Sequence, residues 1–378
     1  MFRSLVSLVL VFSFTFLWNS TDLEAAYLKK IRVLIKEDAL KAKVSIKGRY
    51  TLKSIPNTKV IFEGENLQEV SFKFYKGFIQ IGKARTRLKT LEIVPNNQQG
   101  LRFDANHFRG SLIVTAQKNG LNFINKLYLE EYLWGVLPLE AYDSWPKEVL
   151  KAQAVVSRTY ALYHMNRNKK RWFDVRNDDR NQHYNGKDFE SENSKGGVAE
   201  TKGQILTFKN QVFAAFFHAI CGGHTEYAPA IWPAEQTFPQ SVKCPYCRTA
   251  KKFHWRATIT LKELLEKLNA AGHKIKTIQK IYIKKSKRSE RISHLIFVSK
   301  KHQFVMTAED FRTLMGSEII RSTFFEIQVG KKYLRFAGRG WGHGVGFCQM
   351  GAYGMTKAHK SMKEILRYYY PGTRLIRY

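Results

Sequence analysis

Gly338-Arg-Gly-Trp-Gly-His343-Gly-Val-Gly-Phe-Cys348-Gln-Met-Gly351-Ala352 is the stretch on which the interpretation of this sequence rests. Six glycines fall within its first fourteen residues, around a single histidine. Glycine is disfavoured inside helices and strands, and it is retained where the backbone adopts positive φ or approaches another group closely. The stretch therefore predicts a tight loop that presents an imidazole at the wall of a ligand site. A structural turn with a hydrogen-bonded histidine is the alternative that the spacing leaves open.

The rest of the chain has the pattern of an α+β protein. Its 378 residues suit two domains, or one large domain with an appendage, and 44% hydrophobic and 13% aromatic residues exclude a disordered chain. Residues 30–115 alternate as in a small antiparallel β module. Ser144 and an early proline predict a helix from Lys147 to about Asn168, and the polar segment 171–200 predicts a long loop. Further helices are predicted at Leu261–Ala271, Thr307–Met315 and Ser361–Tyr369, and further strands at Gln204–Phe208, Val212–Ala219, 278–283, 294–298 and Phe324–Val329.

The N-terminus has the features of an export signal. Met1-Phe2-Arg3 precedes a largely apolar run, Leu5–Trp18, which is short for a membrane span but suits the core of a signal peptide. Leu23 or Glu24 stands where cleavage before residue 27 prefers a small residue, so an uncleaved anchor is the alternative. We expect residues 1–26 to be a signal peptide, the mature chain to keep no stable membrane span, and the protein to reach the periplasm or cell envelope.

The charge balance predicts an anionic partner. Sixty-three Lys and Arg against 31 Asp and Glu give a net charge of +32, and such an excess otherwise adds only self-repulsion. The basic residues are spread along the chain, without the basic arm or helix of a DNA-binding protein, and export argues against nucleic acid. A wall polymer, an acidic glycan or a membrane surface is the expected partner, and a solvated surface with no partner is the alternative.

Several motifs, in one order along the chain, resemble the stage II sporulation protein D / amidase-enhancer family. The resemblance covers roughly residues 120–378, and the motifs that carry it, besides the glycine-rich stretch, are Glu131-Tyr132-Leu133-Trp-Gly135-Val136-Leu-Pro-Leu-Glu140, Ala152-Gln-Ala154-Val-Val-Ser-Arg158-Thr159-Tyr160-Ala161, Gln182-His-Tyr184-Asn-Gly186 and Phe217-His218-Ala-Ile-Cys-Gly222-Gly223-His-Thr225. Together with the patterns above, it implies a signal peptide (1–26), a β-rich module (27–119) and a catalytic domain (120–378).

Glu140 is the predicted catalytic residue. It ends an apolar run just before the helix at 147–168, where burial would raise the pKa of its carboxyl as a general acid requires; a surface or capping role is the alternative. The resemblance implies a peptidoglycan lytic transglycosylase in which this glutamate protonates the glycosidic oxygen and then helps the 6-hydroxyl of the sugar to close an anhydro ring. Ordinary glycosidases need two carboxylates. Asp143 is the nearest second candidate, but its place beside a helix start suits capping better.

The other predicted substrate contacts lie on the family motifs. Arg158 falls about 18 Å along its helix, so it approaches Glu140 only if Tyr132–Leu139 forms the other arm of a helical hairpin. Because close pairing would lower the pKa of Glu140, we expect Arg158 to contact substrate; a solvated helical position is the alternative. The remaining candidates, each with a core or structural role as its alternative, are Tyr160, Tyr184, His218, Trp341 and His343.

The cysteines predict a separate site. Cys221, Cys244 and Cys247 lie within 27 residues, and three cysteines with one histidine form a common structural zinc set. His224 is the expected fourth ligand, with His218 and His254 as alternatives. Export also permits a disulfide, whereas the Cys-Pro-Tyr-Cys spacing of a redox motif lacks its βαβ context. We expect Cys348 to be a buried free thiol, because relatives usually have serine there.

The leading interpretation is an exported lytic transglycosylase that cuts the MurNAc–GlcNAc bond of peptide-denuded glycan strands, with no cofactor needed for catalysis. The resemblance implies that it works beside an N-acetylmuramoyl-L-alanine amidase in wall remodelling or division. A non-catalytic wall-binding protein that stimulates such an amidase is the alternative from the same family. A zinc hydrolase is disfavoured because three thiolates close the site and weaken zinc as a Lewis acid. Nucleic-acid binding rests on charge alone.

Overall fold

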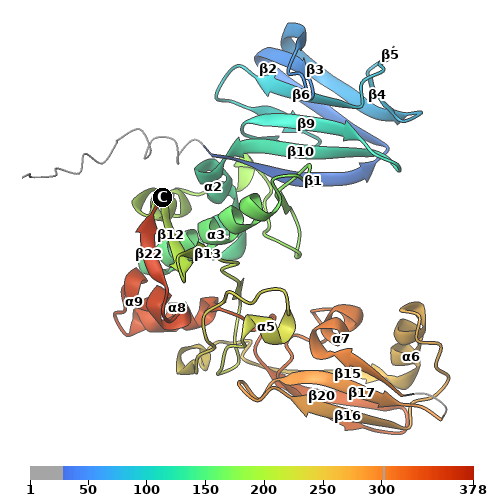
Figure 1. Cartoon of the computed structure of the whole chain (residues 1–378), viewed down its shortest axis with the longest axis vertical. Helices are drawn as coiled ribbons and strands as arrows, with labels where there is room; N and C mark the ends of the chain where they lie inside the picture. Colours follow the sequence, from blue (N-terminus) through green and yellow to red (C-terminus); the bar gives the residue numbers. More distant parts are fainter. Residues whose placement is uncertain (1–28, 301–302) are drawn as a thin grey trace, which may run out of the picture.

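The computed structural model describes residues 29–300 and 303–378; the expected signal peptide lies outside them. Figure 1 shows an elongated molecule with a large sheet at one end, a helical region in the middle and a second β-rich part at the other end. Helices and mostly antiparallel sheets alternate along the chain, which confirms the predicted α+β class.

The N-terminal sheet is antiparallel except at one edge. Its strands follow the order β11-β1-β10-β9-β6-β2-β3-β4-β5, and β11 joins β1 in parallel. The β9–β10 hairpin crosses residues 119–120, so the sheet extends beyond the expected end of the β module to Tyr128. The strands are β1 (Lys30–Ala39), β2 (Lys41–Ser54), β3 (Val60–Tyr75), β4 (Phe78–Ile81), β5 (Ala84–Arg85), β6 (Thr90–Pro95), β7 (Leu101–Phe103), β8 (Asn106–Phe108), β9 (Ser111–Ala116), β10 (Leu121–Tyr128) and β11 (Val175–Arg176).

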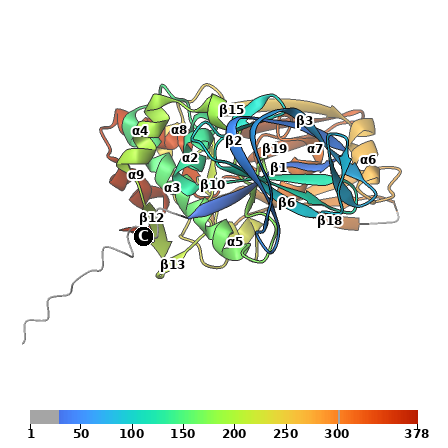
Figure 2. The same cartoon turned by 90° about the horizontal axis from the view of Figure 1, so that it is seen from above.

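The middle of the molecule is built around helix α3 (Lys147–Arg167). A helix that is buried on most of its sides lies in the interior of a domain, and α3 is buried continuously from Ala152 to Leu162. In the view from above, the other helices of this part gather beside it (Figure 2). The elements around it are α2 (Leu129–Glu140), η1 (Lys187–Phe189), α4 (Glu192–Glu200), β12 (Gln204–Phe208), β13 (Gln211–Val212), β14 (Phe217–His218), α5 (Ala228–Ile231), η2 (Pro245–Cys247), β21 (Phe347–Cys348), α8 (Gln349–Lys357), α9 (Met362–Tyr369) and β22 (Arg374–Arg377).

The second β-rich part is inserted between η2 and the glycine-rich stretch. Two three-stranded sheets, β15-β20-β19 and β16-β17-β18, share one hydrophobic core with helices α6 and α7. The Gly340 N–H donates to the Phe253 carbonyl at 2.7 Å, so the chain leaves and rejoins the middle region at one point. Its elements are β15 (His254–Thr260), α6 (Leu261–Ala270), β16 (Lys280–Lys285), β17 (Ile292–Val298), β18 (Gln303–Thr307), α7 (Ala308–Met315), β19 (Phe325–Val329) and β20 (Tyr333–Arg339).

The predicted helices are confirmed within one or two residues, with three local corrections. Residues 192–200 form helix α4, capped by the Ser191 side chain, in place of the expected loop. Only Gln211–Val212 and Phe217–His218 are strands within the expected strand at 212–219. Helix α3 begins after Pro146 with no side-chain cap, so Ser144 is not its N-cap.

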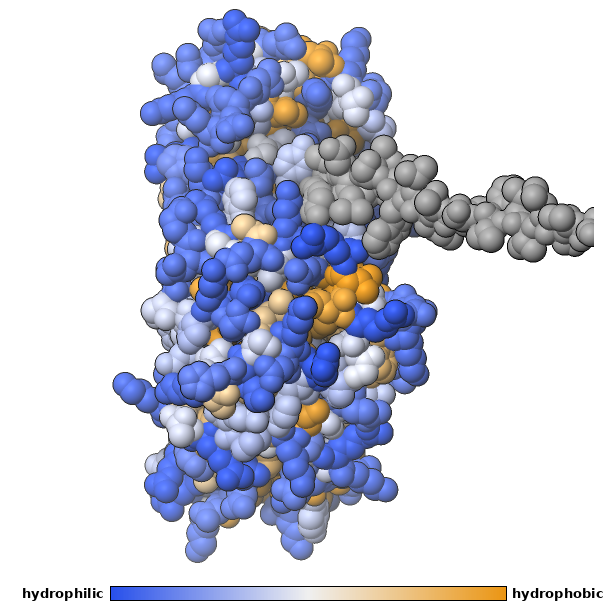
Figure 3. All heavy atoms as spheres, turned by 90° about the vertical axis from the view of Figure 1, so that its left-hand side faces the viewer, coloured by the Kyte–Doolittle hydropathy of each residue, from blue (hydrophilic) through white to orange (hydrophobic). Residues whose placement is uncertain are grey.

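The surface agrees with a highly charged composition. In the face drawn in Figure 3, hydrophilic residues predominate from one end of the molecule to the other. Among the helices within residues 29–300 and 303–378, none is long and apolar enough to cross a bilayer.

Candidate functional site

The hairpin of α2 and α3 positions Glu140. Helix α2 follows β10 without a linker and presents Leu129, Leu133 and Val136 to the core. Gly135 lets the helix approach Tyr184 closely, since a Cβ there would lie 2.8 Å from the Tyr184 ring. Glu140 is the last residue of α2, and its carbonyl accepts a hydrogen bond from the Gln349 side chain at 2.7 Å. The predicted helical hairpin is present.

The Glu140 side chain is half-buried, with protein groups around its carboxyl. Its Oε1 accepts from the His183 backbone N–H at 2.9 Å. Burial raises the pKa of Glu140, and Asp179 adds to that rise, while the His183 hydrogen bond offsets part of it. A carboxyl that holds its proton closer to neutral pH can act as a general acid.

Arg158 is a correction to the predicted site. Its guanidinium is fully buried and donates to Glu130, Nε to Oε1 at 2.8 Å and Nη2 to Oε2 at 2.7 Å. It also donates to the Gln204 and Val198 carbonyls. The hairpin therefore brings Arg158 beside the first turn of α2 and not beside Glu140 at its other end. Arg158 holds α2, α4 and β12 together and is closed to substrate.

Tyr184 and Tyr160 are also buried, where stacking on a sugar was expected. Tyr184 is 1% exposed and donates to the Asn125 side chain at 2.9 Å. Tyr160 is 5% exposed, and its hydroxyl accepts from Asn181 Nδ2 at 3.0 Å. Burial raises the pKa of Tyr160, and the nearby charge of Glu140 contributes. Tyr160 is buried near Glu140, and Tyr184 belongs to the hydrophobic core.

The glycine-rich stretch forms the predicted tight loop. Four alternating glycines have positive φ, from +71° to +103° (Gly340, Gly342, Gly344 and Gly346). Neighbouring groups also leave no room for a side chain at two of these positions. A Cβ on Gly342 would lie 2.8 Å from His218 Cβ, and one on Gly344 would lie 2.4 Å from Arg291 Cζ. Glycine is therefore needed here for both of the expected reasons.

The loop brings His343 against His218. Their ring centroids are 5.5 Å apart, and His343 also contacts the rings of Phe216 and Trp232 at 5.9 and 5.1 Å. His218 Nδ1 lies 3.0 Å from the Val345 carbonyl, and His218 Nε2 is buried with no hydrogen-bond partner. Burial lowers the pKa of His218 to about 3 and lowers that of His343 well below its usual value. Both imidazoles are therefore neutral near pH 7.

Two more accessible aromatic rings flank these groups. Trp341 is half-buried, with the charged ends of Lys252 and Arg321 at 4.5 and 4.6 Å from its ring. Tyr142, two residues after Glu140, is 69% exposed and packs edge-to-face on Trp145, with ring centroids 5.4 Å apart. Exposed aromatic faces suit sugar rings, and Tyr142 lies beside the candidate acid in sequence. Trp341 was predicted from the sequence, and Tyr142 was not.

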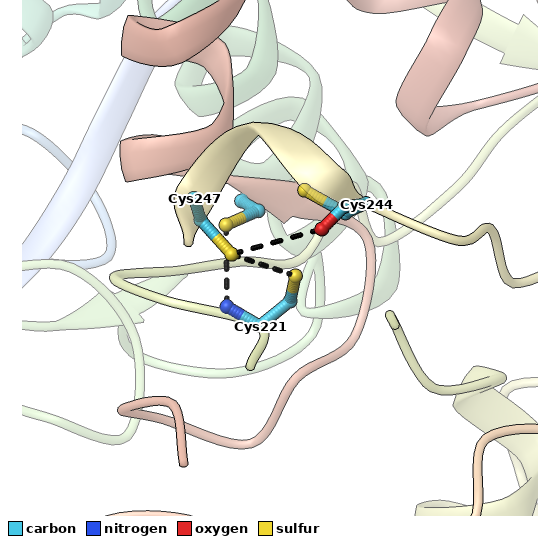
Figure 4. Close-up of side chains that lie close together, drawn as sticks. Cys221, Cys244 and Cys247 are labelled. Atoms are coloured by element: carbon cyan, nitrogen blue, oxygen red, sulfur yellow. Dashed lines mark hydrogen bonds between the residues drawn. The ribbon is translucent and has the colours of Figure 1, made fainter. Parts of the chain in front are cut away.

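The cysteines form one buried cluster with a different fourth member from the expected one. The sulfurs of Cys221, Cys244, Cys247 and Cys348 all lie within 4.8 Å of one another. Figure 4 shows Cys221, Cys244 and Cys247 converging from two segments. Cys348 is buried, as expected, but it faces the other three sulfurs. The Nδ1 of His224, the predicted ligand, lies 2.7 Å from the Thr225 carbonyl, and this histidine is outside the cluster.

Burial raises the pKa of the Cys221 and Cys348 thiols, whereas hydrogen bonds from neighbouring thiols lower the pKa of Cys244 and Cys247. Backbone N–H groups of Cys221 and Gly351 donate to Cys348 Sγ at 3.2 and 3.3 Å, and that of Gly223 donates to Cys221 Sγ at 3.4 Å. Arg291 is 1% exposed, donates to the Cys221 carbonyl and forms no ion pair with a carboxylate within the described residues. Buried charges are normally paired. The cluster is a candidate metal centre.

Besides Tyr142, the sequence did not predict the roles of Glu130, Gln349 and Cys348 in these sites. Glu130 and Gln349 act through contacts between segments distant in sequence, and Cys348 reaches its partners from 101 residues after Cys247. One signal was available for Cys348: a cysteine within the glycine-rich stretch could have been counted with the other three.

Two family models match parts of this chain. Residues 117–208, which hold the α2–α3 hairpin and Glu140, match the SpoIID family model, described as stage II sporulation protein. Residues 235–346 match a domain of unknown function, DUF8618, which contains the inserted part together with Cys244, Cys247 and most of the glycine-rich stretch. The chain belongs to the SpoIID family.

The relatives extend the match over most of the chain. An uncharacterized protein of Brachyspira hyodysenteriae is 35% identical over 289 residues, covering 76% of this chain and 77% of the relative. Stage II sporulation protein D of Bacillus subtilis is 29% identical over 280 residues, covering 67% and 75%. The amidase enhancer of B. subtilis is 26% identical over 297 residues, covering 65% of this chain and 40% of that protein.

Proposed function

We propose that this protein is an exported peptidoglycan lytic transglycosylase. It cleaves the MurNAc–GlcNAc bond of peptide-denuded glycan strands and leaves 1,6-anhydro-MurNAc ends. The observation that carries the proposal is Glu140 itself: burial raises the pKa of its carboxyl, and the His183 N–H fixes one of its oxygens at 2.9 Å.

One carboxyl performs both steps of this reaction. Protonated Glu140 gives its proton to the glycosidic oxygen, and the bond from that oxygen to MurNAc C1 breaks. The MurNAc 6-hydroxyl then bonds to C1, and its proton passes to the Glu140 carboxylate. The acid is restored, no water is consumed, and the neutral imidazoles of His218 and His343 leave the proton balance unchanged.

The surroundings of Asp143 support a single-carboxyl mechanism. Its Oδ1 accepts from the side chains of Ser191 and Ser194, and its Oδ2 accepts from Asn193 Nδ2 at 3.2 Å. Asp143 is thus occupied by side chains at the start of α4, but it does not cap a helix as expected, because Ser191 is the N-cap of α4. A glycosidase mechanism needs a second carboxylate that is free to act on water or on C1.

The Glu140→Gln variant tests the proposal. We expect wild-type protein to release anhydro-MurNAc fragments from denuded strands, as measured by mass spectrometry, and E140Q to release none while still binding the strands. Asp143→Asn is the matched control and should keep the reaction. Reducing-end products, or cutting by E140Q, would contradict the assignment.

The match to an amidase enhancer favours one second candidate. In that role the chain binds the wall without cutting it and stimulates an N-acetylmuramoyl-L-alanine amidase. A folded wild-type protein that binds strands, yields no fragments and accelerates a purified amidase would establish this function in place of the first.

We further propose that the four-cysteine cluster holds a structural zinc ion. Zn–S bonds of about 2.3 Å place the sulfurs of a tetrahedral site about 3.8 Å apart, and the four sulfurs already lie within 4.8 Å. Four thiolates on Zn²⁺ leave a net charge of −2, for which buried Arg291 supplies part of the compensation. Such a closed set serves folding and offers no open position for catalysis.

A further inference from the structure

The inserted module carries a large share of the positive charge of the chain. Residues 254–339 contain 19 Lys and Arg against seven Asp and Glu, a net charge of +12 out of +32 for the whole protein. Nothing in the catalytic chemistry of Glu140 requires this concentration. Excess charge of one sign attracts ligands of the other sign, so the module is expected to bind an anion.

A cavity of about 620 Å³ lies on the open face of the β15-β20-β19 sheet. Arg256 on β15, Arg339 at the end of β20 and Lys285 at the end of β16 contribute cationic side chains to its lining, and His254 and Phe324 also border it. The volume falls in the range of ligand sites.

The lining also contains two carboxylates, Glu290 and Glu326, so its three cations exceed its acids by one. Within the described residues, neither Arg256 nor Lys285 forms a hydrogen bond or ion pair with a carboxylate. Arg339 reaches Glu290 only at 4.0 Å, and the Glu290 side chain is 80% exposed. The Arg339 guanidinium lies 3.8 Å from the centroid of the Phe324 ring, and its Nε is buried with no hydrogen-bond partner. Stacking fixes the orientation of the guanidinium, so this cation is held ready for an anion.

The cavity adjoins the glycine-rich loop. Arg339 is followed directly by Gly340 and Trp341, and Trp341 carries Lys252 and Arg321 on its ring at 4.5 and 4.6 Å. Cations therefore flank this short backbone segment both at Trp341 and in the cavity. The ligand considered for the cavity is the glycan strand of the proposed function.

The proposed substrate supplies such an anion. An amidase removes the stem peptide from MurNAc and leaves a free carboxylate on the lactyl group of the sugar. A denuded strand is therefore a regular polyanion. In peptide-bearing strands the same carboxyl forms an uncharged amide bond with the stem peptide. Arginine pairs with carboxylates through two parallel hydrogen bonds.

We propose that the cavity formed by Arg256, Lys285 and Arg339 binds the lactyl carboxylates of denuded glycan strands. This inference rests on the proposed function and gives the inserted module a role: it recognises the product of an amidase and holds that strand beside the glycine-rich loop.

Equilibrium binding of the full chain tests the inference separately from cleavage. The E140Q protein is titrated with denuded strands and with the same strands after their carboxyls have been converted to methylamides. We expect methylamidation to weaken binding at least tenfold at low salt. The doubly substituted Arg256→Glu/Lys285→Glu chain, also carrying E140Q, should bind denuded strands at least tenfold more weakly and should lose the preference for free carboxyls.

A control with the same change in charge isolates the cavity from net charge. Lys274→Glu/Lys276→Glu removes the same amount of positive charge from exposed positions outside the lining, and we expect it to keep the preference. Equal affinity for both strand preparations would overturn the inference, as would an equal loss in the control. Tighter binding of a phosphodiester wall polymer at the same residues would also overturn it. Failure of the wild-type chain to form anhydro products would instead contradict the proposed function.

Discussion

Arg158 and Glu130 form a two-pronged ion pair between α3 and α2, with donor–acceptor distances of 2.8 and 2.7 Å, and the arginine side chain is fully buried. The pair closes the end of the helical hairpin opposite to Glu140. Its role in activity is therefore indirect: it fixes the direction in which α2 carries Glu140 into the site.

Arg158→Ala should destabilise the fold by about 3–5 kcal/mol, because it leaves the Glu130 carboxylate poorly solvated and without its partner. The free energy of unfolding, obtained from urea denaturation, measures this loss. Strand binding by the fraction that remains folded should be unchanged. A variant with native stability and lost strand binding would show that Arg158 contacts substrate after all.

The raised pKa of Glu140 gives a pH dependence with a definite sign. The first step needs the protonated acid, so kcat/KM should fall as pH rises through the raised pKa. Burial favours the protonated form, so the pKa of Glu140 is higher in the folded than in the unfolded state. Its contribution to the free energy of unfolding is therefore fully present below the unfolded-state pKa and is lost as pH rises through the folded-state pKa. A pH–rate profile and urea denaturation across the same range measure both effects.

Glu140→Gln provides the control for that dependence. Its neutral side chain should make the protein more stable than wild type near pH 7 and should remove this part of the stability slope. An unchanged slope in E140Q would show that the carboxyl is well solvated and would weaken the acid assignment.

Cys348→Ala should remove the bound metal and destabilise the protein by on the order of 4 kcal/mol or more, because loss of a metal site is among the largest single-residue effects. Metal analysis of the purified protein and thermal unfolding measure the two outcomes. His224→Ala is the discriminating control and should keep both metal and stability. Loss of metal from the histidine variant alone would restore the ligand set expected from the sequence.

Gly344→Ala should lower the free energy of unfolding by more than the conformational strain of an alanine at positive φ. That strain alone is about 1 kcal/mol. At Gly344, φ is +82° and the added Cβ would lie 2.4 Å from Arg291 Cζ. At Gly272, φ is +94° with no atom within 4 Å of an added Cβ, so Gly272→Ala isolates the strain alone. Urea denaturation of the two variants gives the difference. Equal losses would mean that Arg291 moves aside at no cost.

The parts of this structure that could be predicted from sequence are those with local signals. The periodic apolar residues of Lys147–Arg167 and the turn-punctuated strands before Tyr128 produced correct elements, and alternating glycines produced the loop at 340–346. Partnerships between distant segments could not be predicted in this way. Arg158 pairs with a residue 28 positions earlier, and no periodicity distinguishes Glu130 from Glu131 as its partner.

The fourth cysteine of the candidate metal centre could not be predicted for the same reason. Cys221, Cys244 and Cys247 are close in sequence and could be grouped by spacing, whereas Cys348 joins them only because β21 pairs in parallel with β14, Cys348 opposite His218. Short, irregular pairings of this kind carry little sequence signal. The histidine expected as fourth ligand was the nearest candidate along the chain but not in space.

The hydrogen bond between Phe253 and Gly340 has an evolutionary consequence. The 86 residues between them begin and end at adjacent backbone positions, so a short turn could replace them without rerouting any other segment. A unit attached in this way can be gained, lost or exchanged between lineages as a single genetic event. Members of the family can therefore share the helical hairpin while differing in what they carry at this junction. On the proposed function, preference among glycan strands can then diversify without a change at Glu140.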